Sequence, residues 1–251
     1  SKWLRRKRMI FEVRDLWPQG AVELSKIKGN LFIKAAYKFE KICYLNSNLV
    51  IAASKGMKES ISDRYASVQP IVITNVADLA LFNGNRDGLS RETKDEFVKC
   101  FIYAGSLGLI DDFGQCIDAM ALVRRDDIKL VVIGDGAERN KLEAKVKDLD
   151  LKNVEFIGLI PKTELRKWYS KAYASILTVK DNNVIQACSP NKMFDSFAAG
   201  VPIIQNSTGW IKELVEKDKC GINVEQHNPR CFADAITYMA DHPSERDIYA
   251  Q

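Results

Sequence analysis

Residues 189–200, "SPNKMFDSFAAG", are followed directly by the apolar run "VPII" at 201–204, the pattern of a helix that leads into a buried strand. Ser189 is expected to be the N-cap and Pro190 the first helical residue, where the missing N–H of proline costs nothing. Lys192 then falls in the first turn, where the helix dipole already places positive charge. The stretch therefore predicts an anion at the N-terminus of this helix.

The same alternation of helix and strand extends along the whole chain. Apolar runs of strand length occur at 9–13, 49–54, 71–74, 100–105, 129–134, 154–158, 174–179, 201–205 and 221–224. Helical patterns lie between them, near 31–46, 56–66, 112–125, 138–149, 162–171, 191–199, 209–217 and 229–240. Strands that are apolar throughout and separated by helices indicate parallel sheets covered on both faces. The predicted fold class is therefore α/β, with doubly wound, Rossmann-like domains.

A polar, Gly- and Asn-rich segment at 81–97 suggests a domain boundary. Residues 97–251 are predicted to form a complete doubly wound domain, and 81–96 a linker. Residues 1–80 hold only three predicted strands, which is few for a stable parallel sheet. We therefore expect 1–80 to be the last part of a second, larger Rossmann-like domain.

Composition narrows the classes of function. The chain has 251 residues, of which 46% are hydrophobic and 28% charged, and it contains no apolar run of the length that spans a membrane. The six cysteines form no CxxC pair and are expected to be reduced thiols, and the two histidines lie at no metal-ligand spacing, so no metal site is predicted. Residues 1–60 carry 13 Lys and Arg against 5 Asp and Glu, a net of +8 in a chain of net +4. This is either a solvated basic face or a surface that meets an anionic membrane or a lipid-linked substrate.

Ligands of open parallel sheets bind outside the carboxyl ends of the strands. Small residues follow several predicted strands and would let backbone amides approach a phosphate, although turns need glycine in any case. The stretch "AGSLGLIDDF" does not match the GxGxxG dinucleotide fingerprint. The candidate donor-binding residues are Gly105, Ser106 and Gly108 after one strand, Gly134, Asp135 and Gly136 after the next, Gly158 and Leu159 after a third, and Ser189, Pro190 and Asn191 at the helix described above.

Two charged side chains of that helix are the candidate catalytic residues. Lys192 would hold the negative charge of a diphosphate, which offsets the unfavourable position of a cation in a first turn. Asp195 lies about one turn further along the same face and would accept hydrogen bonds from sugar hydroxyls. The alternative is that Asp195 is a surface acid that simply pairs with Lys192.

Taken together, "DLWP", "LVIAASKGMKESI", "VITNVADLALF", "YAGSLG", "LVVIGDGAERNKLE", "NVEFIGLIPKTEL" and "SPNKMFDSFAAGVPII" occur in an order that resembles the retaining family-four glycosyltransferases of the GT-B fold. The most similar branch transfers N-acetylated amino sugars such as fucosamine in bacterial surface polysaccharide synthesis. The resemblance implies that 97–251 bind a UDP-sugar and that 1–80 end an acceptor-side domain. It implies that Gly105 and Ser106 lie near the phosphates, Gly158 and Leu159 at the base, Lys192 at the diphosphate and Asp195 at the ribose.

By the same resemblance the substrates are a nucleotide-sugar donor and a glycan or polyprenyl-diphosphate-linked acceptor, with no metal or other cofactor and no nucleic acid. The location implied is cytoplasmic, with peripheral contact at the inner face of the membrane through residues 1–60. Two features depart from the family pattern. Its motif of two glutamates separated by seven residues is represented by Ala187 and Asp195, and the loop after the first donor-domain strand lacks the usual Arg or Lys.

Three other functions remain open from the residues alone. A UDP-sugar 2-epimerase shares the architecture but needs further acid–base groups. A nucleotide-sugar-binding protein that has lost catalysis would fit Ala187, and a Rossmann oxidoreductase would bind NAD(H).

Overall fold

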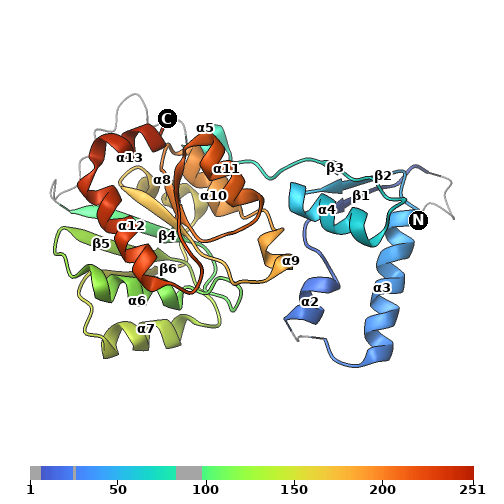
Figure 1. The fold of residues 1–251 in the computed structure, drawn as a ribbon, viewed down its shortest axis with the longest axis horizontal. Helices are drawn as coiled ribbons and strands as arrows, with labels where there is room; N and C mark the ends of the chain where they lie inside the picture. The colour runs from blue at the N-terminus through green and yellow to red at the C-terminus, as the bar shows by residue number, and fades with distance from the viewer. Residues whose placement is uncertain (1–6, 25–26, 83–97) are drawn as a thin grey trace. The chain divides into compact units, whose positions relative to one another are not determined.

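A computed structural model of the chain describes residues 7–24, 27–82 and 98–251. It contains two compact units (Figure 1). Unit 1 comprises residues 1–75 and 182–190, and unit 2 comprises residues 76–181 and 191–251. The linker predicted at 81–96 falls almost wholly outside the described residues, whereas the boundary between the units lies at 75/76. The return of 182–190 to unit 1 has no counterpart in the predicted domains.

Unit 1 is a three-stranded parallel sheet with helices. Strands β1 (Ile10–Val13), β2 (Leu49–Ala52) and β3 (Ile71–Val72) pair in the order β1-β2-β3. The helices are α2 (Gln19–Glu23), α3 (Asn30–Leu45), α4 (Lys55–Arg64) and α9 (Asn183–Gln186). Ser54 caps α4, because its hydroxyl accepts the Met57 amide at 2.9 Å. Val184 of α9 packs in the same buried cluster as Met57 and Ile61 of α4, so α9 is part of the core of unit 1.

Unit 2 is built on a six-stranded sheet. The strands are β4 (Lys99–Ala104), β5 (Ile128–Ile133), β6 (Val154–Gly158), β7 (Ala174–Leu177), β8 (Ile203–Gln205) and β9 (Gly221–Asn223). All pairs are parallel, and the spatial order is β6-β5-β4-β7-β8-β9. This is the 3-2-1-4-5-6 order of dinucleotide-binding folds.

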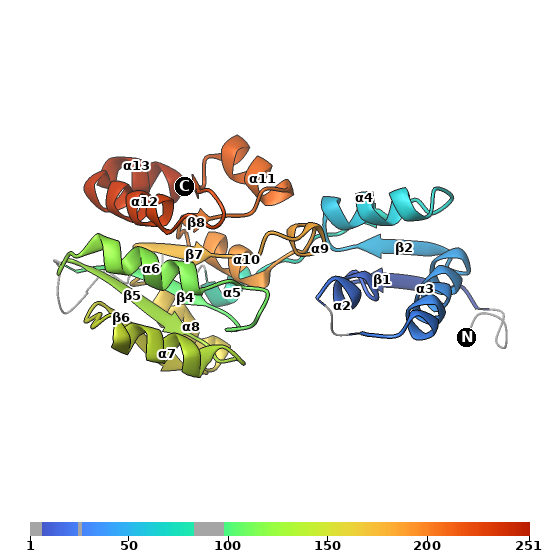
Figure 2. The same ribbon diagram turned by 60° about the horizontal axis from the view of Figure 1, so that its bottom comes forward.

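Helices cover both faces of this sheet, as the continuous apolar strands predict (Figure 2). Phe101 and Tyr103 of β4 pack with α6 (Gly114–Val123) and α12 (Pro229–Asp241). Ile102 and Ala104, which point the other way, pack with α5 (Leu79–Phe82) and α8 (Lys162–Tyr169). The remaining helices are α7 (Arg139–Asp148), α10 (Asn191–Ala198), α11 (Trp210–Asp218) and α13 (Pro243–Tyr249).

Candidate functional site

The topology of unit 2 has its switch point between β4 and β7. Strand β4 pairs with β5 on one side and with β7 on the other, so the order of the strands reverses between β4 and β7. The chain leaves β4 toward α6 on one face and leaves β7 toward α10 on the other. Ligands of doubly wound sheets bind at this switch point. The loop after β4 and the start of α10 therefore form the candidate site.

Lys192 is the centre of this site. Its Nζ donates hydrogen bonds to Asp111 Oδ1 at 2.7 Å and to Tyr103 Oη at 2.8 Å. The side chains of Lys192 and Asp111 are only 14% and 6% exposed. The other oxygen of Asp111 accepts the Ser106 hydroxyl at 3.0 Å and the Gly108 amide at 3.2 Å. The negative charge next to Lys192 in the structure is thus the carboxylate of Asp111, in the loop after β4.

The electrostatics of this cluster follow from burial. Burial lowers the pKa of Lys192, and the neighbouring Asp111 carboxylate opposes that shift. Burial likewise raises the pKa of Tyr103 well above its usual value, with a further contribution from Asp111, so the phenol stays protonated. The Tyr103 hydroxyl accepts from Lys192 and donates to the Ser106 carbonyl. Asp111 and Tyr103 are functional candidates that the sequence analysis missed.

Gly105 makes room for the lysine. A Cβ at this position would lie 3.0 Å from Lys192 Nζ and 3.1 Å from its Cδ, so a side chain here would displace the ammonium group. The Gly105 amide donates to the Ile133 carbonyl at 2.9 Å. In contrast, the Ser106 amide has no hydrogen-bond acceptor among the described residues. This backbone N–H directly follows Gly105, over which the ammonium group of Lys192 lies.

The glycines after β5 hold the neighbouring loops together. Gly134 has φ +142°, and a Cβ there would lie 1.8 Å from the Gly105 carbonyl oxygen. A Cβ on Gly136 would lie 2.4 Å from the Leu107 carbonyl oxygen. The amides of these two glycines donate to Gly158 O at 2.9 Å and to Asp135 Oδ1 at 2.7 Å. The close approach of the loops after β4 and β5 thus explains why glycine is needed at 134 and 136. The roles of these glycines in donor binding stay predictions.

Asp195 is paired with Lys162, at the start of α8. Lys162 Nζ lies 3.0 Å from Asp195 Oδ1, although that oxygen accepts no well-directed hydrogen bond among the described residues. Asp195 is buried, whereas half of the Lys162 side chain is exposed. The alternative interpretation, in which Asp195 pairs with Lys192 on the helix surface, is wrong, because Asp195 pairs with Lys162 of α8 and Lys192 pairs with Asp111 of the loop after β4.

Gly158 and Leu159 lie at the same edge of the sheet. Gly158 has φ +88°, and the space of its absent Cβ is taken by Arg139, whose Nη1 would lie 3.0 Å from it. Arg139 also pairs with Glu143 at 2.8 Å and approaches Asp135 at 3.9 Å. Leu159 is 78% exposed. The loop after β4 contains no Arg or Lys, but Arg139, at the start of α7 after the neighbouring strand β5, places a cation beside Gly158.

The family relationship is decided by comparison with known proteins. The family model described as "Glycosyl transferases group 1" matches residues 98–242, which is more than half of the chain. The chain belongs to this family. One relative is an uncharacterized glycosyltransferase of Methanocaldococcus jannaschii, 28% identical over 83% of this chain and 54% of its own length. Another is the alpha-monoglucosyldiacylglycerol synthase of Streptococcus pneumoniae, 26% identical over 68% of this chain and 40% of its own length. The chain thus spans about half the length of these relatives.

Solved structures show the same fold. The Anabaena protein HepE, in a complex with UDP and glucose, superimposes with a TM-score of 0.76 over 100% of this chain and 66% of its own length, at 16% identity. The predicted fold class, α/β and GT-B-like with a doubly wound, Rossmann-like domain, is confirmed. Because the identity is low, this likeness speaks for the fold alone.

The remaining predicted residues of this glycosyltransferase-family chain flank α10. Ser189 and Pro190 belong to unit 1, where the Ser189 carbonyl accepts the Asn75 side-chain amide at 2.7 Å. Ser189 Oγ makes no hydrogen bond among the described residues, so the predicted N-cap bond is wrong. Helix α10 begins at Asn191, which is exposed. Ala187, at the first position of the family's two-acid motif, is buried in the core of unit 1.

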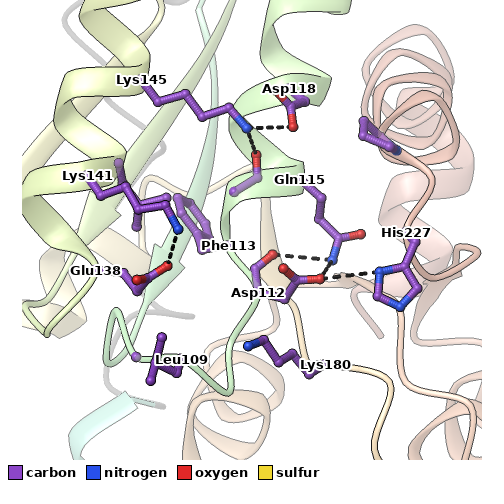
Figure 3. Close-up of a pocket in the computed structure, with 14 residues that line it drawn as sticks. Leu109, Asp112, Phe113, Gln115, Asp118, Glu138, Lys141, Lys145, Lys180 and His227 are labelled. Carbon is purple, nitrogen blue, oxygen red and sulfur yellow. Dashed lines mark hydrogen bonds and ion pairs between the residues drawn. The ribbon is translucent and has the colours of Figure 1, made fainter.

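A second feature of unit 2 is a cavity of about 440 Å³ near the N-terminus of α6 (Figure 3). Asp112 lines it and accepts the Gln115 side-chain amide at 2.9 Å, with His227 Nδ1 3.7 Å away. Asp111 is not among the lining residues. Asp112 has φ +48°, a left-handed conformation that separates these adjacent carboxylates into different clusters. The cavity is lined by Gly108, Leu109, Asp112, Phe113, Gly114, Gln115, Asp118, Glu138, Lys141, Leu142, Lys145, Lys180, His227 and Pro229.

Within residues 7–24, 27–82 and 98–251, no three His, Cys, Asp or Glu side chains are grouped so that they could hold a metal ion. No helix in these ranges is long and apolar enough to cross a membrane. None of the six cysteines, all of which lie in these ranges, forms a disulfide bond.

Proposed function

We propose that this chain is the donor-binding part, with the end of the acceptor-side domain, of a retaining glycosyltransferase that uses a UDP-sugar. The observation that carries the proposal is the buried ammonium group of Lys192 at the topological switch point, next to the Ser106 amide. A diphosphate placed there meets a full positive charge, a backbone N–H and the N-terminal end of α10. Family membership and the UDP complex of Anabaena HepE support a nucleotide-sugar as the ligand.

In this proposal each candidate residue binds a different part of the donor. Lys192 binds the diphosphate and stabilises the charge that develops as it leaves, which is electrostatic catalysis. Asp195, once released from Lys162, accepts the ribose hydroxyls, and the backbone at Gly158 with the exposed Leu159 meets the base. The acceptor hydroxyl attacks the anomeric carbon on the face from which the diphosphate departs, and its proton passes to the leaving phosphate. No metal ion or other cofactor is required.

The transferred sugar is proposed to be an N-acetylated hexose, and the acceptor a glycan or a lipid-linked glycan of surface polysaccharide synthesis. Both follow from the resemblance of the motifs to that branch of the family. The lipid-acting synthase of Streptococcus pneumoniae among the relatives adds support for an acceptor at a membrane. The protein would then work in the cytoplasm at the inner face of the membrane.

Helix α3 supports that location. Its exposed side chains include Leu31, Phe32, Phe39, Ile42 and Leu45, with three exposed lysines between them. The one acid of the helix, Glu40, is buried and pairs with Arg64 at 2.9 Å. Large apolar side chains beside lysines, without an exposed acid, are typical of a helix that lies in an anionic membrane surface. Binding to vesicles of phosphatidylglycerol and phosphatidylcholine should fall with added salt and in Leu31→Glu, but not in Leu122→Glu, an exposed position on α6. Binding that ignores salt and lipid charge contradicts the membrane proposal.

The donor proposal is tested by a thermal-unfolding panel with UDP, GDP, ADP and NAD. A ligand at 100 times its Kd stabilises the folded state by about 2.7 kcal/mol, which is a shift of several degrees. We expect the shift with UDP and a smaller one, or none, with the others. Stabilisation by NAD alone would instead indicate an oxidoreductase.

A second function is favoured by the burial of Ala187 in the core of unit 1, where it meets no sugar. The protein would bind nucleotide-sugars without turning them over. Release of UDP from UDP-hexoses by the full-length protein, with and without an acceptor glycan, separates the two functions. Binding without release supports the non-catalytic one.

A further inference from the structure

We propose that Asp111 is a positioning residue for the donor diphosphate. It holds the ammonium group of Lys192 above the loop after β4, so that one N–H of the lysine remains for the ligand. The inference rests on the proposed function, since it concerns the same site. Asp111 itself does not touch the donor in this proposal.

The hydrogen bonds of Lys192 leave one donor for a ligand. An ammonium group carries three N–H bonds. One is directed to Asp111 and one to Tyr103, at 2.7 and 2.8 Å. The group lies over Gly105, where only a glycine leaves space for it. The third N–H is therefore left to bind a phosphate. The ammonium group that carries it is already held beside the Ser106 amide, so the lysine does not have to move.

Asp111 is itself fixed. Its second oxygen accepts the Ser106 hydroxyl and the Gly108 amide, and the residue is 5% exposed. Together with Lys192 of α10, these two donors from the loop after β4 hold the carboxylate in one position. It therefore cannot turn toward solvent. A diphosphate that takes the third N–H leaves this arrangement intact, so the ion pair between Lys192 and Asp111 does not have to be broken.

In the described part of the chain, no other group that faces Lys192 can replace Asp111. Tyr103 of β4 and Cys116 of α6 are neutral because burial raises the pKa of each well above its usual value. On α10 itself, Asp195 is paired with Lys162 of α8. Tyr169 of α8 donates to the Lys192 carbonyl and is protonated, since burial raises its pKa. Asp112, the next residue in the loop, is paired with Gln115 and His227.

Loss of the Asp111 charge should therefore act on the protonation of Lys192. Burial already lowers the pKa of Lys192, and the carboxylate opposes that shift. In Asp111→Asn the opposing charge is gone, so the ammonium loses its proton at a lower pH. UDP binding that depends on this cation then declines at a lower pH as well.

The experiment is calorimetry of UDP binding between pH 6.5 and 9.5 for the wild type, Asp111→Asn and Asp112→Asn. We expect Asp111→Asn to bind roughly tenfold more weakly or worse at pH 7.5, with its alkaline loss of affinity beginning at lower pH. Asp112→Asn, the matched control, should follow the wild type. In the double variant Asp111→Asn with Lys192→Arg, the guanidinium stays charged throughout, and the alkaline loss should disappear.

Asp111→Glu keeps the charge but moves it by one methylene group. This variant is measured as well, and it tests the inference if Asp111→Asn does not fold. It should bind UDP more weakly than the wild type with an unchanged pH profile. A wild-type profile and affinity in Asp111→Asn, or the same early alkaline loss in Asp111→Glu, overturns the inference. If the wild type itself does not bind UDP at any pH, the proposed function fails, which is a different result.

Discussion

Lys192 and Asp111 are 81 residues apart in the sequence, yet Lys192 Nζ lies 2.7 Å from Asp111 Oδ1. This contact joins the two elements that leave the sheet at its switch point, the loop after β4 and helix α10. A lysine in a first helical turn is unfavourable without a negative partner. The protein supplies that partner itself, so the cation is held in place in the absence of a ligand.

Removal of this cation should weaken donor binding strongly. Hydrogen bonds to charged groups contribute about 1.5–3 kcal/mol, so Lys192→Ala should raise the Kd of UDP roughly 10- to 100-fold. Lys212→Ala serves as the control, since Lys212 is about half exposed on α11 and only approaches Glu216 at 3.8 Å. Calorimetry with UDP measures both. Unchanged UDP affinity in Lys192→Ala would show that the diphosphate binds elsewhere.

Two glycine substitutions should separate folding from binding. Gly134 has φ +142°, and in Gly134→Ala the new Cβ would lie 1.8 Å from the backbone oxygen of Gly105. Relief of this clash requires the backbone itself to move. We expect a loss of at least about 2 kcal/mol, or roughly 5 °C in Tm. In Gly105→Ala the Cβ meets only the flexible end of Lys192. Its Tm should change little, while UDP affinity falls because the ammonium is displaced.

Thermal unfolding and calorimetry on the same two variants check this prediction. A large loss of Tm in Gly105→Ala would mean that the Lys192 cluster is needed for the stability of the fold and not only for the binding of UDP. Full UDP affinity in Gly105→Ala would mean that the position of the ammonium is unimportant.

The sequence pattern was sufficient for the sheets and the longer helices. All nine predicted strands are present, and the most buried of them, such as β5, β7 and β8, are continuous apolar runs, as expected of parallel strands covered on both faces. Helices α2, α5, α9 and α13 were missed, since four to seven residues are too few to display a helical period. The return of α9 to unit 1 was also missed, because local patterns do not report which core a short segment joins.

The candidate site was predictable only in part. Lys192 stood out because its charge conflicts with the helix dipole. Its partner did not, because "LIDD" at 109–112 contains two adjacent acids and only the fold separates them. The glycines at 105 and 134 were expected to let backbone amides approach a ligand, whereas the atoms next to them in the structure belong to Lys192 and to a neighbouring loop. Such contacts join residues that are far apart in the sequence, so no local sequence pattern reveals them.

Acid stability should depend on Asp127. Its carboxylate accepts two hydrogen bonds from Arg125, at 2.8 and 2.7 Å, and one from Lys99 at 3.3 Å. The hydrogen bonds from Arg125 first, and then the one from Lys99, hold the pKa of Asp127 well below its usual value. A carboxyl whose pKa is lowered by folding stabilises the protein above its unfolded pKa, near 4, and loses that contribution as the pH falls further.

We therefore expect Asp127→Asn to have a lower Tm than the wild type at pH 7 and a smaller fall in Tm between pH 5 and pH 3. Asp126→Asn, an exposed neighbour, controls for the loss of charge alone. Parallel Tm curves for the wild type and Asp127→Asn across this range would contradict the role of the Arg125 pair.

Discrimination of the ribose hydroxyls should depend on Asp195. The wild type should bind UDP about tenfold or more tightly than 2′,3′-dideoxy-UDP, because hydrogen bonds to a carboxylate are lost with the hydroxyls. Asp195→Ala should bind both ligands equally. Lys162→Met, which removes the side chain that now pairs with Asp195 at 3.0 Å, should keep the discrimination and bind UDP at least as tightly as the wild type. If Asp195→Ala still discriminates, the ribose is held by other groups, and Asp195 serves only to pair with Lys162.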